Sequence, residues 1–374
     1  MKAIHFLIKP ASSLCNLRCQ YCFYDDISNN RAEKSMGVMT QETVRVLLED
    51  AFHSIEPGGT VGFAFQGGEP TVAGLDFFRR FVEQARALCP AGVEISFSIQ
   101  TNAVLLNRDW AEFFAQNRFL VGISLDGYKD LHDLYRKDGA GGGTWTKAVR
   151  GLGLLQRSGV MVNALCVVTA QCARHPDRVY SELKKLGFEH LQFIPCLDPL
   201  DTPREQMPYS LTPEDYGRFL CRLFDLWYQD WEDGKYHSVR LFDDYVHLLL
   251  GDAPSTCATC GRCGGYFVVE GDGSVYPCDF FVLDRWRLGR LGESSLEELA
   301  QGETAQAFFQ WRQEKPAECV RCRWRVLCNG GCKNDWTNEP EPHNYFCSAF
   351  QRFFAYSEER LLTIARAEQR TRIQ

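Results

Sequence analysis

The sequence has no long hydrophobic run. Its first ten residues contain only a few consecutive apolar side chains before Lys9 and Pro10. This run is too short for a signal peptide or for a helix that spans a membrane. We therefore expect a cytoplasmic protein that has no membrane partner.

An excess of basic residues is also missing. The 41 lysines and arginines are outnumbered by 48 aspartates and glutamates, which gives a formal net charge of −7. Proteins that bind nucleic acids usually carry a basic stripe or a high isoelectric point, so we expect no nucleic-acid partner. The sequence shows no internal repeat, low-complexity stretch or heptad pattern, and its 45% hydrophobic and 24% charged residues are typical of a globular protein.

Cysteine, in contrast, is abundant. The chain has 17 cysteines, an odd number, and no recognisable secretion signal. In a reducing compartment such thiols bind metals more often than they form disulfides. The cysteine spacing therefore carries the functional information.

Cys15, Cys19 and Cys22 follow an apolar segment and lie on one short loop. A four-iron four-sulfur cluster bound by three thiolates keeps one iron open to another ligand. The alternative is a structural zinc site, which requires a fourth Cys or His close by. His5 precedes the loop and His53 falls in the next predicted helix, so the spacing favours an iron–sulfur cluster with one open iron.

Residues 1–236 alternate between predicted strands and predicted helices. Helices are expected over Thr40–Ile55, over Leu75–Leu88 and from Thr212 onwards, because each carries an apolar face at helical spacing. The expected strands are Ile4–Ile8, Val61–Phe65, Glu94–Ile99, Leu120–Leu125, Val162–Val168 and His190–Ile194. This alternation predicts an α/β domain with parallel strands, a partial (β/α)6 TIM-like barrel, whose ligands bind at the carboxyl ends of the strands.

Residues 237–374 show a different sequence pattern and form a second predicted domain. A β-hairpin with glycines at its turn is expected over residues 266–278, and a helix from about Phe346. Nine of the 17 cysteines lie in this part of the chain. Two metal sites of four cysteines account for eight of them, and the spacing fits zinc as well as iron and sulfur.

The Cys15, Cys19 and Cys22 loop, with Tyr21 before the third cysteine, resembles the signature of radical S-adenosylmethionine enzymes. The resemblance implies that S-adenosylmethionine binds the open iron and that one-electron reduction releases a 5′-deoxyadenosyl radical. It also implies an external one-electron reductant of the flavodoxin or ferredoxin type.

The run Cys319-x2-Cys322-x5-Cys328-x3-Cys332 resembles the SPASM domain, which binds auxiliary clusters. The resemblance implies three [4Fe-4S] clusters in the whole chain. One auxiliary cluster is expected on Cys257, Cys263, Cys278 and Cys332, and the other on Cys319, Cys322, Cys328 and Cys347. Cys260 is then the spare cysteine and competes with Cys257 as a ligand.

Longer strings, such as Cys22-Phe23-Tyr24, Gln66-Gly67-Gly68-Glu69-Pro70 and Tyr276-Pro277-Cys278-Asp279, resemble anaerobic sulfatase-maturating enzymes. These enzymes oxidise a cysteine or serine in an unfolded sulfatase precursor to Cα-formylglycine. The resemblance implies that this reaction is the function of the chain. Asp279 is then the base that takes the thiol or hydroxyl proton, and an auxiliary cluster accepts the remaining electron.

The same resemblance assigns the remaining site residues. Glycines before Glu69 allow the backbone to approach the cofactor, and an arginine can pair with its carboxylate. The expected S-adenosylmethionine-binding residues are Tyr21, Gly68, Glu69, Ser124, Asp126, Arg136 and Leu197. The residues expected to face the substrate peptide are Tyr24, Gln66 and Gln100.

Two alternatives remain at this stage. One is a SPASM enzyme that forms thioether or carbon–carbon cross-links in a ribosomal peptide. Such enzymes often carry an N-terminal peptide-recognition domain, whereas this cluster loop starts at residue 15, which favours sulfatase maturation. The other alternative is a non-catalytic zinc scaffold.

Overall fold

The fold was taken from a computed structural model that describes residues 1–337 and 342–373. The chain divides into two compact units, each built from separate segments. The first unit comprises Met1–Ser124, His132–Asn163 and Gly264–Trp311; the second comprises Leu125–Leu131, Ala164–Cys263 and Arg312–Gln374. From the sequence we expected two continuous domains, with a boundary between residues 236 and 237. This boundary stays a prediction.

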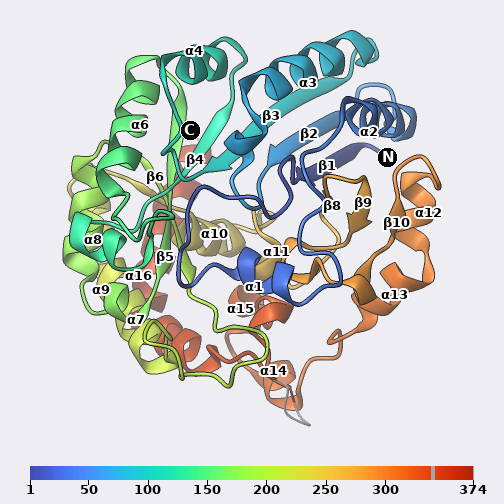
Figure 1. Cartoon of the computed structure of the whole chain (residues 1–374). Helices are drawn as coiled ribbons and strands as arrows, with labels where there is room; N and C mark the ends of the chain where they lie inside the picture. The colour runs from blue at the N-terminus through green and yellow to red at the C-terminus, as the bar shows by residue number, and fades with distance from the viewer. Residues whose placement is uncertain (338–341, 374) are drawn as a thin grey trace. The chain divides into compact units, whose positions relative to one another are not determined.

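The first unit contains four parallel strands that are neighbours in chain order. They are β1 (Ala3–Ile8), β2 (Thr60–Phe65), β3 (Glu94–Thr101) and β4 (Leu120–Ser124). Figure 1 shows them side by side, with their carboxyl ends on one edge. The strands expected from the sequence are confirmed here, and the two loops that carry the most distinctive motifs follow β1 and β2.

Helices pack against this sheet, and aromatic side chains lie in the core between helix and sheet. The covering helices include α2 (Gln41–Ser54), α3 (Leu75–Leu88), α4 (Arg108–Gln116) and α6 (Trp145–Arg157). On α3 the side chains of Phe78 and Phe81 are fully buried and lie edge-on against Phe65 of β2 at 4.9 Å between ring centroids. Both helices expected in this unit are confirmed, and the Thr40 side chain caps α2 by accepting a bond from the Thr43 N–H.

The β-hairpin also belongs to the first unit. Its strands are β8 (Phe267–Val269) and β9 (Ser274–Tyr276), so the expected hairpin is confirmed. The sequence did not predict that β8 pairs in parallel with β1. A short strand, β10 (Gly289–Arg290), then pairs with β9. The hairpin thus extends the sheet beyond β1 and leads directly into Cys278 and Asp279.

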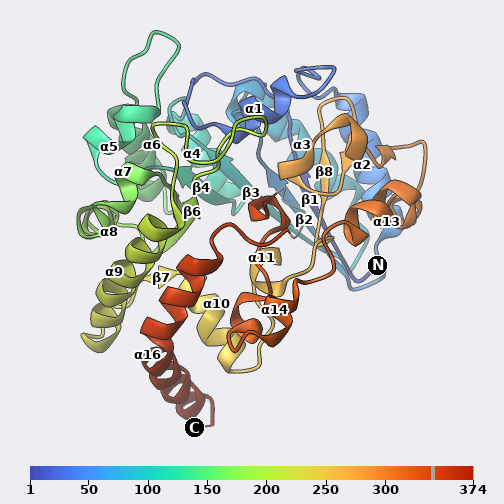
Figure 2. The same ribbon diagram turned by 90° about the horizontal axis from the view of Figure 1, so that it is seen from below.

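The second unit has its own strand pairs and a helical layer. From Ala164 onwards, β5 (Met161–Val168) pairs in parallel with β6 (His190–Pro195), which pairs with β7 (Ser238–Val239). The long helices are α8 (Pro176–Lys185), α9 (Pro213–Glu232), α10 (Arg240–Leu249) and α16 (Cys347–Ile373). Figure 2 shows α16 beside α9, where the Phe224 and Phe353 rings meet edge-on at 5.6 Å.

Short helices complete the described structure. They are α1 (Phe23–Asn29), α5 (Lys129–Tyr135), α7 (Ala170–Ala173), α11 (Cys257–Cys260), α12 (Leu296–Gln301), α13 (Glu303–Gln310), α14 (Ala317–Arg321) and α15 (Arg325–Cys328). In the described ranges, no helix has the length and apolar character that crossing a membrane requires.

Candidate active site

The loop with the first three cysteines runs from the end of β1 to the start of α1. Its backbone is held by the segment after α5, because the Arg18 N–H donates to the Lys137 carbonyl at 2.7 Å and the Gln20 N–H to the Tyr135 carbonyl at 3.0 Å. Cys22 occupies the N-cap position of α1. Backbone bonds to residues 135–137 therefore hold the middle of the loop, directly before the start of α1.

The three thiols of this loop are partly buried. Burial raises the pKa of the Cys15 thiol to about 12, and it also raises the pKa of Cys22. The Leu17 N–H donates to the Cys15 sulfur at 3.3 Å, the kind of bond that stabilises a thiolate. A low-polarity pocket with an N–H group on sulfur fits a thiolate cluster, which displaces the thiol protons when it binds.

The loop after β2 comes close to the cysteine loop. Gly67 and Gly68 have φ angles of +82° and +42°. A Cβ added to Gly68 would lie 2.4 Å from the Leu14 carbonyl oxygen, next to Cys15. Only glycine permits this approach of the two loops, a role that the sequence did not indicate. The expected approach of the glycine backbone to the cofactor stays a prediction.

The Glu69 carboxylate is buried and fully engaged. It accepts bonds from the Thr71 N–H and hydroxyl, from the Thr101 hydroxyl and from the Asn102 N–H, at 2.6–3.1 Å. Burial raises its pKa, and these donors oppose the rise. Its side chain thus ties the loop after β2 to the end of β3, while its N–H donates to Leu14. The expected contact of this loop with the cofactor stays a prediction.

Other residues expected at the cofactor lie at the ends of strands. Ser124 ends β4, and its hydroxyl accepts a bond from the Gln100 amide of β3 at 3.0 Å. In the second unit, Asp126 is buried and accepts from the Val167 N–H at 2.9 Å. Leu197 follows β6 and is half-buried.

Arg136 and Tyr21 lie together in the first unit. The guanidinium carbon of Arg136 is 5.4 Å from the centre of the Tyr21 ring, and both side chains are buried. The Tyr21 ring also meets Tyr135 edge-on at 6.0 Å. The aromatic residue of the cysteine motif therefore packs against the arginine that we expected to bind a carboxylate.

Asp279 is the centre of a buried network of phenols. Its carboxylate accepts one bond from the Tyr24 hydroxyl and one from the Tyr266 hydroxyl, each at 3.0 Å. The Gln66 amide donates to the Tyr24 oxygen at 2.5 Å. The structure thus brings together Asp279, Tyr24 and Gln66, three residues that the sequence singled out.

Burial raises the pKa of Asp279, and the two tyrosine bonds and Lys9 act against that rise. Burial and the neighbouring Asp279 raise the pKa of Tyr24 well above its usual value, so this phenol stays a donor. A buried carboxylate with two phenol donors can accept a proton from a group placed beside it.

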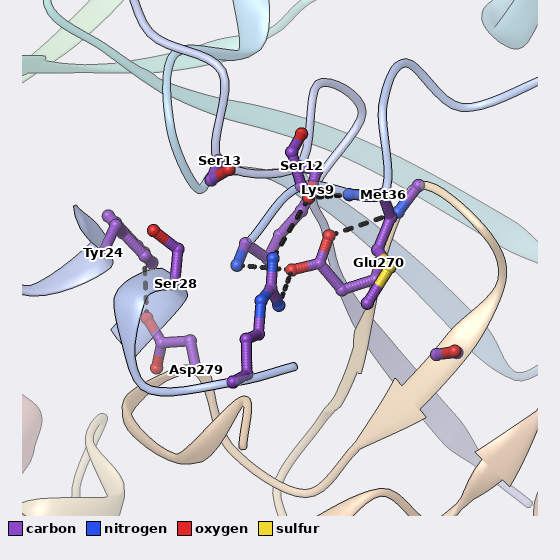
Figure 3. Close-up of polar contacts among 12 residues, drawn as sticks. Lys9, Ser12, Ser13, Tyr24, Ser28, Met36, Glu270 and Asp279 are labelled. Atoms are coloured by element: carbon purple, nitrogen blue, oxygen red, sulfur yellow. Dashed lines mark hydrogen bonds and ion pairs between the residues drawn. The ribbon is translucent and has the colours of Figure 1, made fainter. Parts of the chain in front are cut away.

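Four residues near this network were missed as site residues. They are Tyr266, Lys9, Arg31 and Glu270. Figure 3 shows Lys9 and Glu270 in contact beside the Tyr24–Asp279 pair. A lysine at the end of the apolar strand and a glutamate directly after Val268 and Val269 were the signals in the sequence, because a charge in such a position needs a buried partner.

In the second unit, four cysteines from three helices, α14, α15 and α16, line one cavity. Cys319 lies on α14, Cys322 ends it, Cys328 ends α15 and Cys347 begins α16. All four line a cavity of about 260 Å³ together with Trp324, Phe350 and Phe354. Burial raises the pKa of Cys328 to about 11. Four thiols around an aromatic-lined space of this size fit a cuboidal cluster.

The other predicted set is divided between the units. Cys257, Cys263 and Cys332 belong to the second unit, and Cys278 belongs to the first. Cys260 lines the cavity of Cys319, Cys322, Cys328 and Cys347, a position that the spacing did not indicate. Among residues 1–337 and 342–373, no three His, Cys, Asp or Glu side chains meet closely enough to share a single metal ion.

Comparison with protein families agrees with this geometry. Residues 10–171 match the Radical SAM superfamily, and residues 257–323 match SPASM, described as an iron-sulfur cluster-binding domain. The chain is thus a radical S-adenosylmethionine enzyme whose α/β partial barrel is joined to a domain for auxiliary iron–sulfur clusters.

Similar proteins define the class further. The chain is 45% identical to a cysteine-type anaerobic sulfatase-maturating enzyme of Clostridium novyi (strain NT), with 98% of both chains covered. It is 31% identical to a serine-type enzyme of Bacteroides thetaiotaomicron, over 95% of this chain and 89% of the relative. The solved structure of native anSMEcpe with bound AdoMet and Cp18Cys peptide matches with a TM-score of 0.93 at 42% identity, over 98% of this chain and 99% of the other. The chain belongs to the family of anaerobic sulfatase-maturating enzymes.

Gly68→Ala is expected to displace the cysteine loop, because the new Cβ meets the Leu14 carbonyl and alanine is strained at φ +42°. The backbone strain should lower the free energy of unfolding by about 1–3 kcal/mol. Iron content and S-adenosylmethionine affinity should both fall. Gly92→Ala is the control, because Gly92 also has a positive φ but an added Cβ there has no neighbour within 4 Å. Equal iron content in the two variants would show that the close approach at Gly68 is unimportant.

Proposed function

We propose that this enzyme oxidises a cysteine in an unfolded sulfatase precursor to Cα-formylglycine. The observation that carries the proposal is Asp279, a buried carboxylate that accepts two tyrosine hydroxyls and directly follows the predicted cluster ligand Cys278. The greater identity to the cysteine-type relative, 45% against 31% for the serine-type relative, supports cysteine as the target.

We further propose that residues 1–236 form the radical domain, that residues 237–374 form the auxiliary domain, and that three [4Fe-4S] clusters bind. Cys15, Cys19 and Cys22 hold the first cluster, and Cys319, Cys322, Cys328 and Cys347 hold an auxiliary cluster in their shared cavity. Cys257, Cys263, Cys278 and Cys332 hold the remaining one. The seventeen cysteines support a reducing, cytoplasmic setting. Membership of the radical S-adenosylmethionine enzymes supports a one-electron donor of the flavodoxin or ferredoxin type.

In this proposal the residues of the chain bind the cofactor, orient the peptide and remove one proton. When bound, the clusters and S-adenosylmethionine supply a radical that takes a β-hydrogen from the target residue and an acceptor for the electron that remains. Tyr21, Gly68, Glu69, Ser124, Asp126, Arg136 and Leu197 form the cofactor-binding set.

Tyr24, Gln66 and Gln100 face the peptide, and Asp279 receives the thiol proton of the target cysteine. Loss of one hydrogen atom, one proton and one electron converts the CH2–SH group to a thioaldehyde. Water then replaces sulfur, and the products are the aldehyde and hydrogen sulfide. Tyr24 and Tyr266 keep the Asp279 carboxylate in a single orientation through this sequence.

A peptide with the pattern Cys-x-Pro-x-Arg tests the function directly. Incubated with the enzyme, S-adenosylmethionine and a reductant without oxygen, it should lose about 18 mass units, because the thiol carbon becomes an aldehyde. The matched peptide with serine in place of cysteine should react more slowly. A loss of about two mass units with sulfur retained would indicate cross-linking and would contradict the proposal.

Asp279→Asn should reduce peptide oxidation by roughly 100-fold or more, because an amide cannot accept the proton. Reductive cleavage of S-adenosylmethionine should continue, which liquid chromatography of 5′-deoxyadenosine measures. Asp284→Asn is the control, since the described hydrogen bond of the Asp284 carboxylate is to the exposed Ala32 N–H. Oxidation by Asp279→Asn at the rate of the parent enzyme would rule out the base role.

Cys319→Ala should lower the iron content by about four of about twelve atoms, because one cluster loses a ligand. Cys260→Ala should retain the full content, even though Cys260 lines the same cavity. Iron and sulfide analysis of anaerobically reconstituted protein measures both. If Cys260→Ala loses iron and Cys319→Ala does not, the ligand assignment is wrong.

A further inference from the structure

Three buried charged side chains lie beside Asp279 and have no part in the proposed chemistry. Lys9 follows β1, Arg31 follows α1 and Glu270 follows β8; their exposed fractions are 1%, 6% and 0%. One oxygen of Glu270 accepts from the Lys9 Nζ at 2.7 Å and from the Arg31 Nη1 at 2.6 Å. Burial alone raises the pKa of Glu270, but the two cations outweigh it and lower the pKa to about 2, so the carboxylate is ionised.

The stem of the Lys9 side chain lies against the loop after β2. A Cβ added to Gly67 would be 2.4 Å from the Lys9 Cε and 2.7 Å from its Cγ. The backbone of Gly67 is therefore covered by the lysine methylenes, without space for one more atom. Gly67 is joined to Gly68 and Glu69, so the position of Lys9 determines where this proposed cofactor-binding loop can lie.

The ammonium group of Lys9 lies against the other half of the site. Its Nζ is 5.4 Å from the centre of the Tyr24 ring, a cation–π distance. The hydroxyl of the same tyrosine donates to Asp279. A single side chain thus contacts both the loop that is proposed to hold the cofactor and the tyrosine that holds the proposed base.

Arg31 shares the carboxylate but bonds to different groups. Its Nη2 donates to the Ser12 hydroxyl at 3.2 Å and to the Lys34 carbonyl at 3.0 Å. Removal of either cation leaves Glu270 paired with the other one. The two cations therefore make a matched pair of sites for substitution.

We propose that Lys9 is a positioning residue: held by Glu270, it sets the distance between the Gly67–Gly68–Glu69 loop and the Tyr24–Asp279 pair. The correct distance ensures that each cleavage of the cofactor leads to oxidation of the peptide. The inference rests on the proposed function. A displacement of the loop by a fraction of an ångström still permits cofactor cleavage, but it moves the reacting atoms out of alignment.

Lys9→Met tests the inference, because methionine keeps most of the stem and loses the bond to Glu270. The ratio of oxidised peptide to 5′-deoxyadenosine should fall about fivefold or more. In samples of equal iron content this ratio does not depend on the fraction of folded enzyme, so a merely structural role would not change it. S-adenosylmethionine affinity, measured by calorimetry on the unreduced enzyme, should stay within about threefold of the parent value.

Arg31→Met is the control, with the same loss of one buried cation. It should lower the melting temperature to a similar extent and keep the product ratio within about twofold of the parent enzyme. An unchanged ratio in Lys9→Met, or an equal fall in both variants, would overturn the inference. If Lys9→Met does not fold, Lys9→Gln takes its place with the same expected fall, because its amide ends one bond short of the Lys9 Nζ that Glu270 holds at 2.7 Å. If the parent enzyme itself produces 5′-deoxyadenosine without any aldehyde, the proposed function fails instead.

Discussion

The parallel pairing of β8 with β1 is the constraint on which the proposed active site depends. Across this pairing the Lys9 N–H donates to the Val269 carbonyl at 2.8 Å, and on the other side of β1 the Gln66 N–H donates to Ile8 at 2.9 Å. The residues that follow β1, β2 and β8 therefore emerge at one edge of the sheet. Lys9 and Glu270 meet there because their strands end together. Gln66, which follows β2 at the same edge, donates to Tyr24, and the turn after β9 brings Asp279 to the same tyrosine.

Burial of the charges of Lys9, Arg31 and Glu270 at this edge has a desolvation cost, and a gain in stability does not explain why the charges are there. A buried ion pair recovers in Coulomb attraction roughly what it loses in desolvation, and an apolar replacement of similar volume is often equally stable. Removal of one partner is different, because it leaves a charge without compensation. The bonds of Lys9 and Arg31 to Glu270 join the sheet edge to the segment after α1, and the stem of Lys9 lies against the loop after β2, so an arrangement that separates these segments leaves a buried charge without its partner.

Much of this structure could be predicted from local sequence signals. The apolar alternation predicted the strands of the first unit, and Thr40 and Thr212 were found at the N-caps of α2 and α9. The resemblance to the SPASM domain indicated four of the five cysteines that line the cavity of the second unit, Cys319, Cys322, Cys328 and Cys347. Short-range patterns of this kind depend on a few neighbouring residues, and the sequence shows them directly.

The contacts that define the proposed base could not be predicted in the same way. Asp279 and Tyr24 are 255 positions apart, and Lys9 and Glu270 are 261 apart. Their meeting depends on the β1–β8 pairing, for which a three-residue strand carries little signal. The position of Cys260 was unexpected for a similar reason. The one-turn helix α11 is held by Thr259, which bonds to Asp244, and by Asn329, which donates to the Thr259 carbonyl, and these distant partners turn Cys260 towards the cavity.

Thiol burial connects the fold to the cofactors. Because burial raises the pKa of Cys15 to about 12 and that of Cys328 to about 11, these thiols are protonated at neutral pH when no metal is bound. Cluster insertion must therefore release protons, and assembly becomes more favourable as the pH rises. The Arg18 and Gln20 N–H groups donate to the carbonyls of Lys137 and Tyr135, and these backbone bonds restrict the conformations of the cysteine loop. Part of the free energy of ordering this loop is therefore supplied by the protein backbone and not by cluster binding.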